Sequence, residues 1–370
     1  MKHVCLLCLL LSISLLSGCR DRINIEDISL SLLVGIDLDK ENQLLISSSS
    51  PVFNTEAKEK EENTVVKTTT LRHSRQQFDA TINALTSRGK LQVLLIGKRV
   101  LQHKDWFPIL DSFYRDSKDT VMTRVVLVDG PVSDILLFKH KDKPRLPLYL
   151  TKLLDTAHQR NITVITSLQE LHRQFSDRGL SPSITELKKD GEIKVTGTAL
   201  LDRSGKYKLS LNADETQLLR IMQHETDGQF TFTIHLPQQS DDGIFHENMM
   251  SFVPEAISVK TKTNYKDNKF IFDIGVNMRI TIKERLFSFD VKRKAPELEK
   301  NIQEELQKQF SRLLKKIQNA NIDPIGLGLY ARAYEYSEWK EVQDKWGEAL
   351  SKAEVRVNVL AKIQAMGAMK

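Results

Sequence analysis

The sequence predicts a multidomain α+β protein of 370 residues. In the first half, short apolar strands alternate with amphipathic helices, which predicts a mixed sheet covered by helices. In the second half, turn-forming residues separate pairs of strands, and one long helix carries a continuous apolar stripe. We therefore expect an N-terminal mixed sheet with helices and a C-terminal, mainly antiparallel sheet with a long-helix layer.

The first nineteen residues have the pattern of an export signal. Lys2 precedes an apolar run over residues 4–16, and Ser17, Gly18 and Cys19 follow it. The run is too short for a stable membrane-spanning helix, which needs about 20 residues, but it suits a signal peptide. Small residues before a cysteine resemble the bacterial lipobox. We predict a lipoprotein signal peptide over residues 1–18, cleavage between Gly18 and Cys19, and S-diacylglycerol and N-acyl (palmitate) chains on Cys19. An ordinary signal peptide is the alternative.

Cysteine usage agrees with this prediction. The chain has three cysteines, Cys5, Cys8 and Cys19, and the first two lie inside the predicted signal peptide. The mature chain then keeps one cysteine, whose sulfur carries lipid. This excludes a disulfide framework, a cysteine nucleophile and a cysteine-based metal site, so packing alone must stabilise the fold.

A membrane-proximal spacer, residues 19–27, and an N-terminal domain, residues 28–185 in one or two subdomains, should follow the signal peptide. Turn-forming residues separate its short apolar runs, and capping residues such as Ser74 or Gly89 bound its helical stretches. Strands are expected over residues 28–37, 43–48, 64–70, 91–96 and 122–128, and helices over residues 74–89, 103–114, 147–159 and 167–177.

The C-terminal domain, residues 190–370, is predicted to pack a helical layer on its sheet. Residues 193–201 and 207–211 flank a glycine-containing turn and predict a hairpin, and Asn212 or Asp214 caps the next helix. Further strands are expected over residues 229–236, 257–265, 270–282 and 355–359, and helices over residues 297–319 and 328–350. The apolar stripe of the first of these helices consists of Leu298, Ile302, Leu306, Phe310, Leu313 and Ile317.

The sequence contains no motif that predicts catalysis, a cofactor or a metal. It has neither a Gly-Lys-Ser/Thr phosphate loop nor a Gly-x-Ser-x-Gly elbow, and its nine histidines show no His-Glu-x-x-His spacing. His224, His235 and His246 are spaced as no single helix or strand face requires. The net charge of +6 is spread among interleaved acids and bases, without the basic stripe and aromatics of a nucleic-acid site. We expect no enzyme, no cofactor, no metal and no nucleic-acid partner.

Aromatic residues at helical spacing in residues 328–350 have two interpretations. Such side chains usually pack in a core, but Tyr and Trp are also enriched at interfaces. We interpret Tyr330, Tyr334 and Trp339 as core residues. Trp346 lies next to Lys345 and Gly347, and both interpretations stay open for it; we name it as a candidate partner-binding residue on an exposed patch.

Several short stretches, each weak alone, occur in a specific order along the chain. They are Ile25-Glu26-Asp27, Val34-Gly35-Ile36-Asp37, Gly97-Lys98, Val195-Thr196-Gly197-Thr198-Ala199-Leu200-Leu201, Asp323-Pro324-Ile325-Gly326-Leu327-Gly328, Arg332 and Trp339. Together with the lipobox and the length, they resemble the Ger(x)C family, the lipoprotein C subunits of bacterial spore germinant receptors. One departure is Arg20, where the family commonly has tryptophan.

The resemblance implies a non-catalytic, lipid-anchored subunit on the outer face of the spore inner membrane. It would assemble with two integral-membrane partners, the A and B subunits, in a receptor needed for nutrient-triggered germination. A substrate-binding lipoprotein of a transporter is the alternative. Such proteins have two lobes of parallel sheet, which the hairpin-rich second half disfavours. A lipid-tethered hydrolase is disfavoured by the absence of catalytic motifs.

Overall fold

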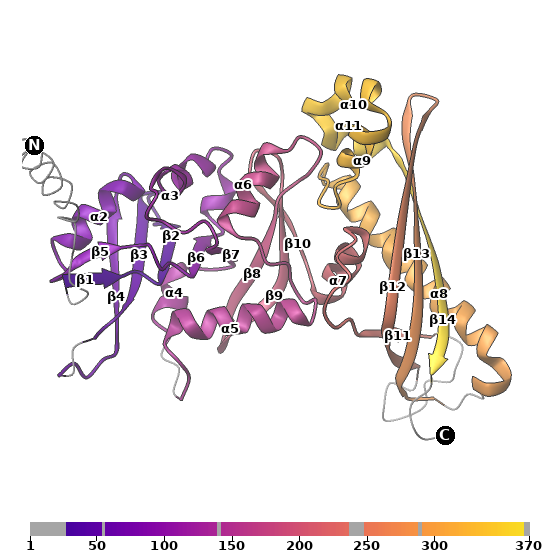
Figure 1. The fold of residues 1–370 in the computed structure, drawn as a ribbon, viewed down its shortest axis with the longest axis horizontal. Coiled ribbons are helices and arrows are strands. Elements are labelled where there is room, and N and C mark those ends of the chain that lie inside the picture. Colours follow the sequence, from indigo (N-terminus) through magenta and orange to yellow (C-terminus); the bar gives the residue numbers. More distant parts are fainter. Residues whose placement is uncertain (1–26, 54–55, 139–141, 237–247, 288–290, 366–370) are drawn as a thin grey trace, which may run out of the picture.

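The computed structural model describes residues 27–53, 56–138, 142–236, 248–287 and 291–365. The predicted signal peptide and Cys19 lie outside the described residues. The described part is elongated, with the N-terminal elements at one end and a long, narrow sheet at the other (Figure 1). It contains mixed helix and strand content in several sheets, which confirms the predicted multidomain α+β class. No helix in the described ranges is long and apolar enough to span a bilayer.

An eight-stranded mixed sheet forms the first part of the molecule. Its strands are β2 (Leu33–Leu38), β3 (Leu44–Pro51), β4 (Glu61–Thr68), β6 (Val93–Gly97), β7 (Arg124–Val128), β8 (Ser183–Asp190), β9 (Glu192–Leu201) and β10 (Tyr207–Leu211). They lie in the order β10-β9-β8-β7-β6-β2-β3-β4. The four central strands, β8, β7, β6 and β2, run parallel, and antiparallel strands flank them on both sides.

Helices cover both faces of this sheet, as its apolar central strands require. One face packs against α2 (Leu71–Asp79), η2 (Val100–Gln102), η3 (Phe107–Leu110), α3 (Asp111–Arg115) and α6 (Leu168–Ser176). The other packs against α4 (Val132–Leu136) and α5 (Leu146–Gln159). A separate two-stranded sheet pairs β1 (Ile28–Leu30) in parallel with β5 (Leu85–Ser87) beside α2 (Figure 1).

The large sheet continues across the expected domain boundary at residues 185–190. Asp190 pairs with Glu192, so Gly191, at φ +70°, is the turn of a β8–β9 hairpin rather than part of a linker. The predicted hairpin over residues 193–211 forms as β9 and β10, but it extends the first sheet instead of opening the second one.

The C-terminal part begins with α7 (Ala213–Met222), whose N-terminus has the capping box of Asn212 and Glu215. A four-stranded sheet follows in the order β11 (Phe232–His235), β12 (Met249–Lys266), β13 (Lys269–Arg285) and β14 (Glu354–Ala365). Only the β13–β14 pair is parallel. This sheet therefore has the mainly antiparallel character that the sequence predicts.

The long helix α8 (Val291–Asn319) covers one face of the four-stranded sheet (Figure 1). All six residues of the predicted stripe are buried, and Leu306 and Phe310 are completely so. The single helix predicted over residues 328–350 is wrong. The chain forms α9 (Leu327–Tyr334), α10 (Tyr336–Val342), η4 (Gln343–Lys345) and α11 (Trp346–Lys352), because the backbone leaves helical geometry at Glu335 and Lys345.

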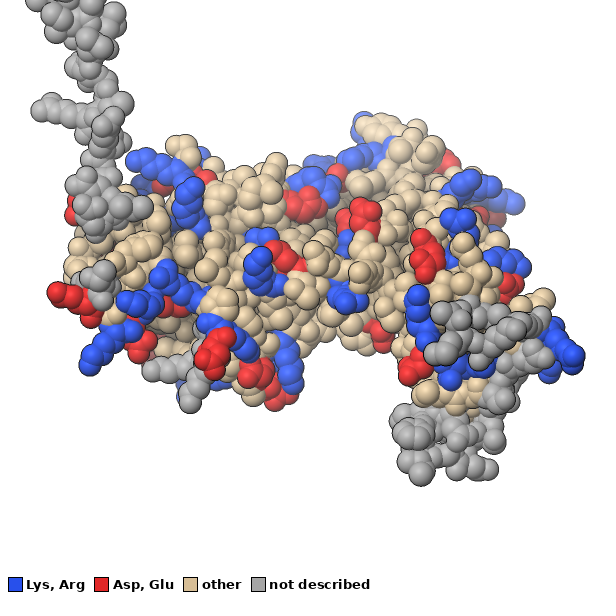
Figure 2. Space-filling model, turned by 60° about the horizontal axis from the view of Figure 1, so that its bottom comes forward, with Lys and Arg blue, Asp and Glu red and all other residues tan. Residues whose placement is uncertain are grey.

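Charged side chains lie on the surface with both signs interspersed. Figure 2 shows Lys and Arg next to Asp and Glu along the whole length of the face in view. This agrees with the interleaved charge pattern of the sequence. On that face, no large region of one sign indicates a nucleic-acid surface.

Candidate functional site

Asp323 lies four residues after the end of α8, and its side chain is completely buried. Its carboxylate accepts the N–H groups of Gly326 and Gly328, each at 2.8 Å, and the indole N–H of Trp346 at 2.7 Å. Gly326 has φ +87°, a conformation that favours glycine, and lets the chain turn into α9. One buried carboxylate thus organises the loop over residues 323–328.

The same aspartate connects this loop to the segment between α6 and β8. The N–H of Ser181 donates to the carbonyl of Asp323 at 2.7 Å, and the N–H of Asp323 donates to Oγ of Ser181 at 2.8 Å. Gly179 packs against Gly328 so closely that a Cβ on Gly179 would lie 2.6 Å from a backbone carbon. We call these residues, with Trp346, the Asp323 joint.

Burial raises the pKa of Asp323, and the donated hydrogen bonds, led by that of Trp346, oppose this rise. Backbone and indole N–H groups surround the carboxylate, and no ion pair to it occurs among the described residues. A polar group held in this way contributes to a unique packing arrangement, because each displaced donor or acceptor would be buried unpaired.

A second pair of motif residues meets at the ends of two parallel strands. Asp37 is the last residue but one of β2 and accepts the N–H of Val132 at 2.9 Å, and Gly97 ends β6 beside it. A Cβ on Gly97 would lie 2.2 Å from Oδ1 of Asp37, so only glycine leaves room for the carboxylate. Burial raises the pKa of Asp37, against the hydrogen bond from Val132.

Lys98 forms a small charged cluster next to this pair. Its Nζ lies 2.8 Å from Oδ1 of Asp129, 3.8 Å from Oε1 of Glu186 and 4.4 Å from the ring centroid of Tyr207. Burial raises the pKa of Glu186, whose side chain is 5% exposed. These contacts join β6, β7, β8 and β10, and they leave the Lys98 charge paired within the protein.

Comparison with protein families accounts for the order of these motifs. The model for spore germination protein N-terminal domains matches residues 21–189, and the model for the C-terminal domain of spore germination B3/GerAC-like proteins matches residues 196–367. The chain belongs to the Ger(x)C family. Each half of this Ger(x)C chain therefore matches one germination-protein domain. The two matched regions meet near the β8–β9 hairpin.

Individual relatives can be aligned with most of this chain. The Ger(x)C chain is 25% identical to spore germination protein A3 of Bacillus subtilis, over 96% of both chains. It is 22% identical to spore germination protein GerQC of Bacillus cereus, over 75% of both chains. The crystal structure of the GerBC protein has the same fold, with a TM-score of 0.58 and 17% identity over 92% of this chain and all of that one.

The motif residues of this Ger(x)C protein therefore make contacts that pack one segment of the chain against another. Arg332 forms an ion pair with Asp177 at 3.3 Å and lies over the ring of Trp339, 5.6 Å from its centroid. Gly197, at φ +145°, passes so close to Leu211 that a Cβ would clash with its carbonyl. Sequence reasoning identified these residues, but not the contacts that Arg332 makes with the distant Asp177 and Gly197 with Leu211.

The aromatic residues of α9 to α11 need two corrections. Trp346 is 3% exposed and contacts Phe270 and Phe272, so its predicted place on an exposed patch is wrong. Tyr334 was expected in the core, yet it is 67% exposed. Trp339 is buried as predicted, and Tyr330 is partly buried and hydrogen-bonds to His224 at 2.9 Å. Tyr334 of α9 and Tyr336 of α10 are therefore the exposed aromatic residues of this segment.

His224 and His235 do not meet in a metal site. In the described ranges no group of three or more His, Cys, Asp or Glu side chains has the geometry to hold a metal ion. His246 lies outside the described residues.

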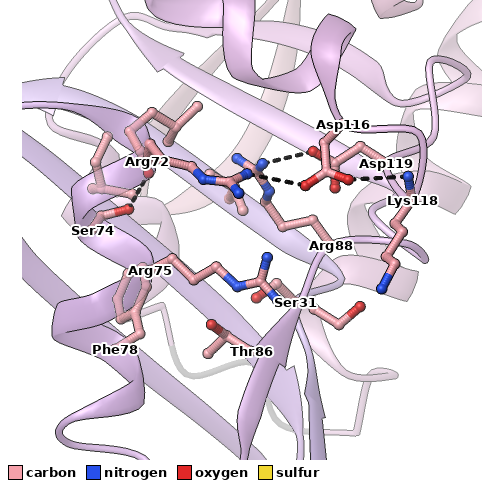
Figure 3. Close-up of a pocket in the computed structure, with 14 residues that line it drawn as sticks. Ser31, Arg72, Ser74, Arg75, Phe78, Thr86, Arg88, Asp116, Lys118 and Asp119 are labelled. Carbon is pink, nitrogen blue, oxygen red and sulfur yellow. Dashed lines mark hydrogen bonds and ion pairs between the residues drawn. The ribbon is translucent and has the colours of Figure 1, made fainter. Parts of the chain in front are cut away.

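A pocket with three arginines is lined by residues of α2 and the segment after β5 (Figure 3), at the end of the molecule where the described chain begins (Figure 1). Arg72 and Arg75 come from α2, Arg88 follows β5, and Asp116, Lys118 and Asp119 follow α3. We call it the arginine pocket. No family motif quoted above supplies its charged residues, so sequence reasoning missed it. The spacing of Arg72 and Arg75, three residues apart on one helix, was the available signal.

Proposed function

We propose that this Ger(x)C chain is the lipid-anchored C subunit of a spore germinant receptor, needed for nutrient-triggered germination. The observation that carries the proposal is the match of both family models, in order, over residues 21–189 and 196–367. The alignment with spore germination protein A3 over 96% of each chain supports a role for the entire chain rather than for one shared domain.

The geometry of the motif residues favours a scaffold over a catalyst. Asp323 and Asp37 are buried and accept hydrogen bonds from the protein's own N–H groups, and Lys98 is paired with Asp129. A catalytic acid, base or nucleophile must reach a substrate. The subunit therefore acts by assembling with the integral-membrane A and B subunits and holding them in a responsive arrangement.

The proposed anchor is Cys19, modified by S-diacylglycerol and an N-acyl chain after cleavage behind Gly18. Two or more acyl chains give lasting attachment, whereas one chain binds only marginally. Residues 19–27 then separate the bilayer from β1. The protein would sit on the outer face of the spore inner membrane.

Co-purification tests the assembly directly. A full-length chain tagged after Lys370 is extracted from spore membranes in neutral detergent and captured. We expect two integral-membrane proteins, the A and B subunits, to elute with it. Recovery of the chain without either of them from wild-type spores would contradict the proposal.

The anchor is tested separately with Cys19→Ala in cells that lack both partners. This change removes the acylated sulfur, so the protein should no longer stay in the membrane fraction as the mature lipoprotein does. Ser17→Ala is the matched control, because it keeps a small residue in the lipobox. Retention of a cleaved Cys19→Ala chain after a high-salt wash would refute the anchor without affecting the assembly proposal.

A further inference from the structure

The arginine pocket is a cavity lined by both polar and apolar side chains. Its cavity volume is about 40 Å³, and one water molecule needs roughly 10–15 Å³ by the same measure. Buried apolar side chains, among them Leu71 and Phe78, form the floor, and hydroxyls of Ser31 and Thr86 line the wall. The space suits one small oxyanion.

Positive charge is in excess around the cavity. Four basic side chains, Arg72, Arg75, Arg88 and Lys118, line it, against two carboxylates, Asp116 and Asp119. Arg72 pairs with Asp116 at 3.2 Å, and Arg88 pairs with Asp119 at 2.7 Å. These two pairs use both carboxylates of the lining and include Arg72 and Arg88, so Arg75 is the arginine of the lining that belongs to neither pair.

Arg75 extends into the space between Arg88 and Thr86 (Figure 3). Its guanidinium forms no hydrogen bond or ion pair with the described residues, although it lies close enough to Arg88 for their charges to interact. Burial is the main cause that lowers the pKa of Arg88, and the like charges of Arg75 and Arg72 lower it further, against Asp119 and Asp116. A bound anion would relieve this repulsion.

We propose that the arginine pocket binds a phosphate group, either free or in the headgroup of an anionic phospholipid. Guanidinium groups present paired N–H donors that match phosphate oxygens. The three arginines reach the cavity from α2 and from the segment after β5, so they surround a ligand on several sides. A tetrahedral oxyanion offers oxygens in these several directions, whereas a carboxylate offers only two in one plane.

The place of the pocket makes the lipid source geometrically accessible. Ser31 lines the cavity and follows β1 directly. The chain from Cys19 to Ile28 spans at most ~30 Å when extended. The lipid source rests on the proposed anchor at Cys19, but binding of phosphate itself does not.

Binding is measured on the full chain in neutral detergent, by calorimetry and by heat stabilisation with inorganic phosphate. Chloride at equal ionic strength is the comparison, because exposed charges are screened by any salt. We expect saturable binding at one site and a rise in melting temperature with phosphate. Chloride should give neither effect, and a lack of saturable phosphate binding would overturn the proposal.

Arg75→Gln should weaken phosphate binding at least tenfold, and Arg75→Lys should weaken it less, because lysine keeps the charge and loses the planar fork. Arg160→Gln is the matched control, since Arg160 is an exposed arginine at the end of α5. The melting temperature without phosphate should not fall in either glutamine variant, because among the described residues Arg75 has no hydrogen bond or ion pair to lose and its charge repels Arg88. Equal affinity of Arg75→Gln and the unmodified chain would also overturn the proposal.

Dihexanoyl phosphatidylglycerol and dihexanoyl phosphatidylcholine, each below its micellar concentration, distinguish the two phosphate sources. Tighter binding of the glycerol lipid than of inorganic phosphate, lost in Arg75→Gln, would assign a headgroup. Binding of inorganic phosphate alone would assign the free anion. Because these measurements use the isolated chain, their failure would leave the germinant-receptor proposal standing, and failed co-purification would leave the pocket standing.

Discussion

The indole N–H of Trp346 donates to Oδ2 of Asp323 at 2.7 Å, and both side chains are buried. Trp346 begins α11, whereas Asp323 follows α8 and pairs with Ser181 from the first half of the chain. A single hydrogen bond therefore connects the last helix to the point where the two halves meet. Loss of this hydrogen bond should lower the free energy of unfolding of the C-terminal part.

Trp346→Phe tests this bond. An aromatic ring stays buried, but the indole donor is lost, and Oδ2 of the buried Asp323 keeps only the N–H of Gly328. The free energy of unfolding should therefore fall by about 1–3 kcal/mol. Trp339→Phe is the control, because Trp339 is equally buried and its Nε1 has no hydrogen-bond partner in the described ranges. Urea unfolding of both variants should give the larger loss for Trp346→Phe. Equal losses of unfolding free energy in the two variants would mean that the smaller ring, and not the missing hydrogen bond, causes the destabilisation.

Gly97→Ala should destabilise the first sheet. The new Cβ would lie 2.2 Å from Oδ1 of Asp37, which must move away from the N–H of Val132. We expect a loss of about 1–3 kcal/mol in thermal or urea unfolding. Gly275→Ala, also in a strand, should be neutral or slightly stabilising, because the nearest atom is 3.9 Å away. A silent Gly97→Ala would refute the close packing of the two motifs.

The α8 stripe gives a third prediction. Leu306 and Phe310 are completely buried, so truncation of either one to alanine should cost about 2–5 kcal/mol. Lys308 lies between them on the exposed side, with its side chain 62% exposed, and Lys308→Ala should stay within about 0.5 kcal/mol of the unmodified chain. Chemical denaturation measures all three, and similar effects at the three sites would contradict the assigned helix face.

The raised pKa of Glu186 should make the free energy of unfolding depend on pH. Burial raises its pKa in the folded state above 4.5, against the hydrogen bond from Ser210 and the charge of Lys98, while Asp129 adds to the rise. As pH increases from 4.5, the unfolded chain loses this proton first, so the raised pKa lowers folding stability until the folded state also deprotonates.

Glu186→Gln removes this titration and keeps the shape of the side chain. The stability advantage of Glu186→Gln over the unmodified chain should therefore grow as pH rises above 4.5 and level off once the folded carboxyl has also lost its proton. Urea unfolding at several pH values measures it. An advantage that shrinks with rising pH would show that Lys98 dominates and that the folded carboxyl titrates below its ordinary range.

Much of the fold follows from local signals in the sequence. The capping residue Asn212 and the glycine-containing turn before residue 207 correctly predict α7 and the β9–β10 hairpin. The spacing of Leu306 and Phe310 correctly predicts the buried face of α8. Caps, turns and periodic stripes are properties of adjacent residues, so one chain is sufficient to recognise them.

Local signals fail where a distant partner decides the structure. Helix α2 begins after Thr70, whose side chain accepts the N–H of His73, so the predicted start at Ser74 is wrong. Residues 85–87, predicted as helical, form β5 because β1 pairs with them across more than fifty residues. The burial of Trp346 likewise depends on Asp323 and on strand β13, which no helical periodicity reveals.

The same limit applies to the candidate sites. Asp323, Gly97 and Arg332 could be selected as motif residues, but their roles depend on Ser181, Asp37 and Asp177, which lie far away in the sequence. The arginine pocket depends on the approach of Arg88 to α2, and Arg88 follows β5, which pairs with the distant strand β1.

Germination of spores that lack this chain tests the central claim most directly. Loss of optical density is followed after exposure to a panel of single nutrients and, in parallel, to a chemical trigger that bypasses receptors. The account predicts that the response to the nutrients of one receptor disappears, that the bypass response remains, and that the unmodified gene in trans restores the lost response. Normal germination with every nutrient, or equal loss of the bypass response, would contradict a role as a germinant-receptor subunit.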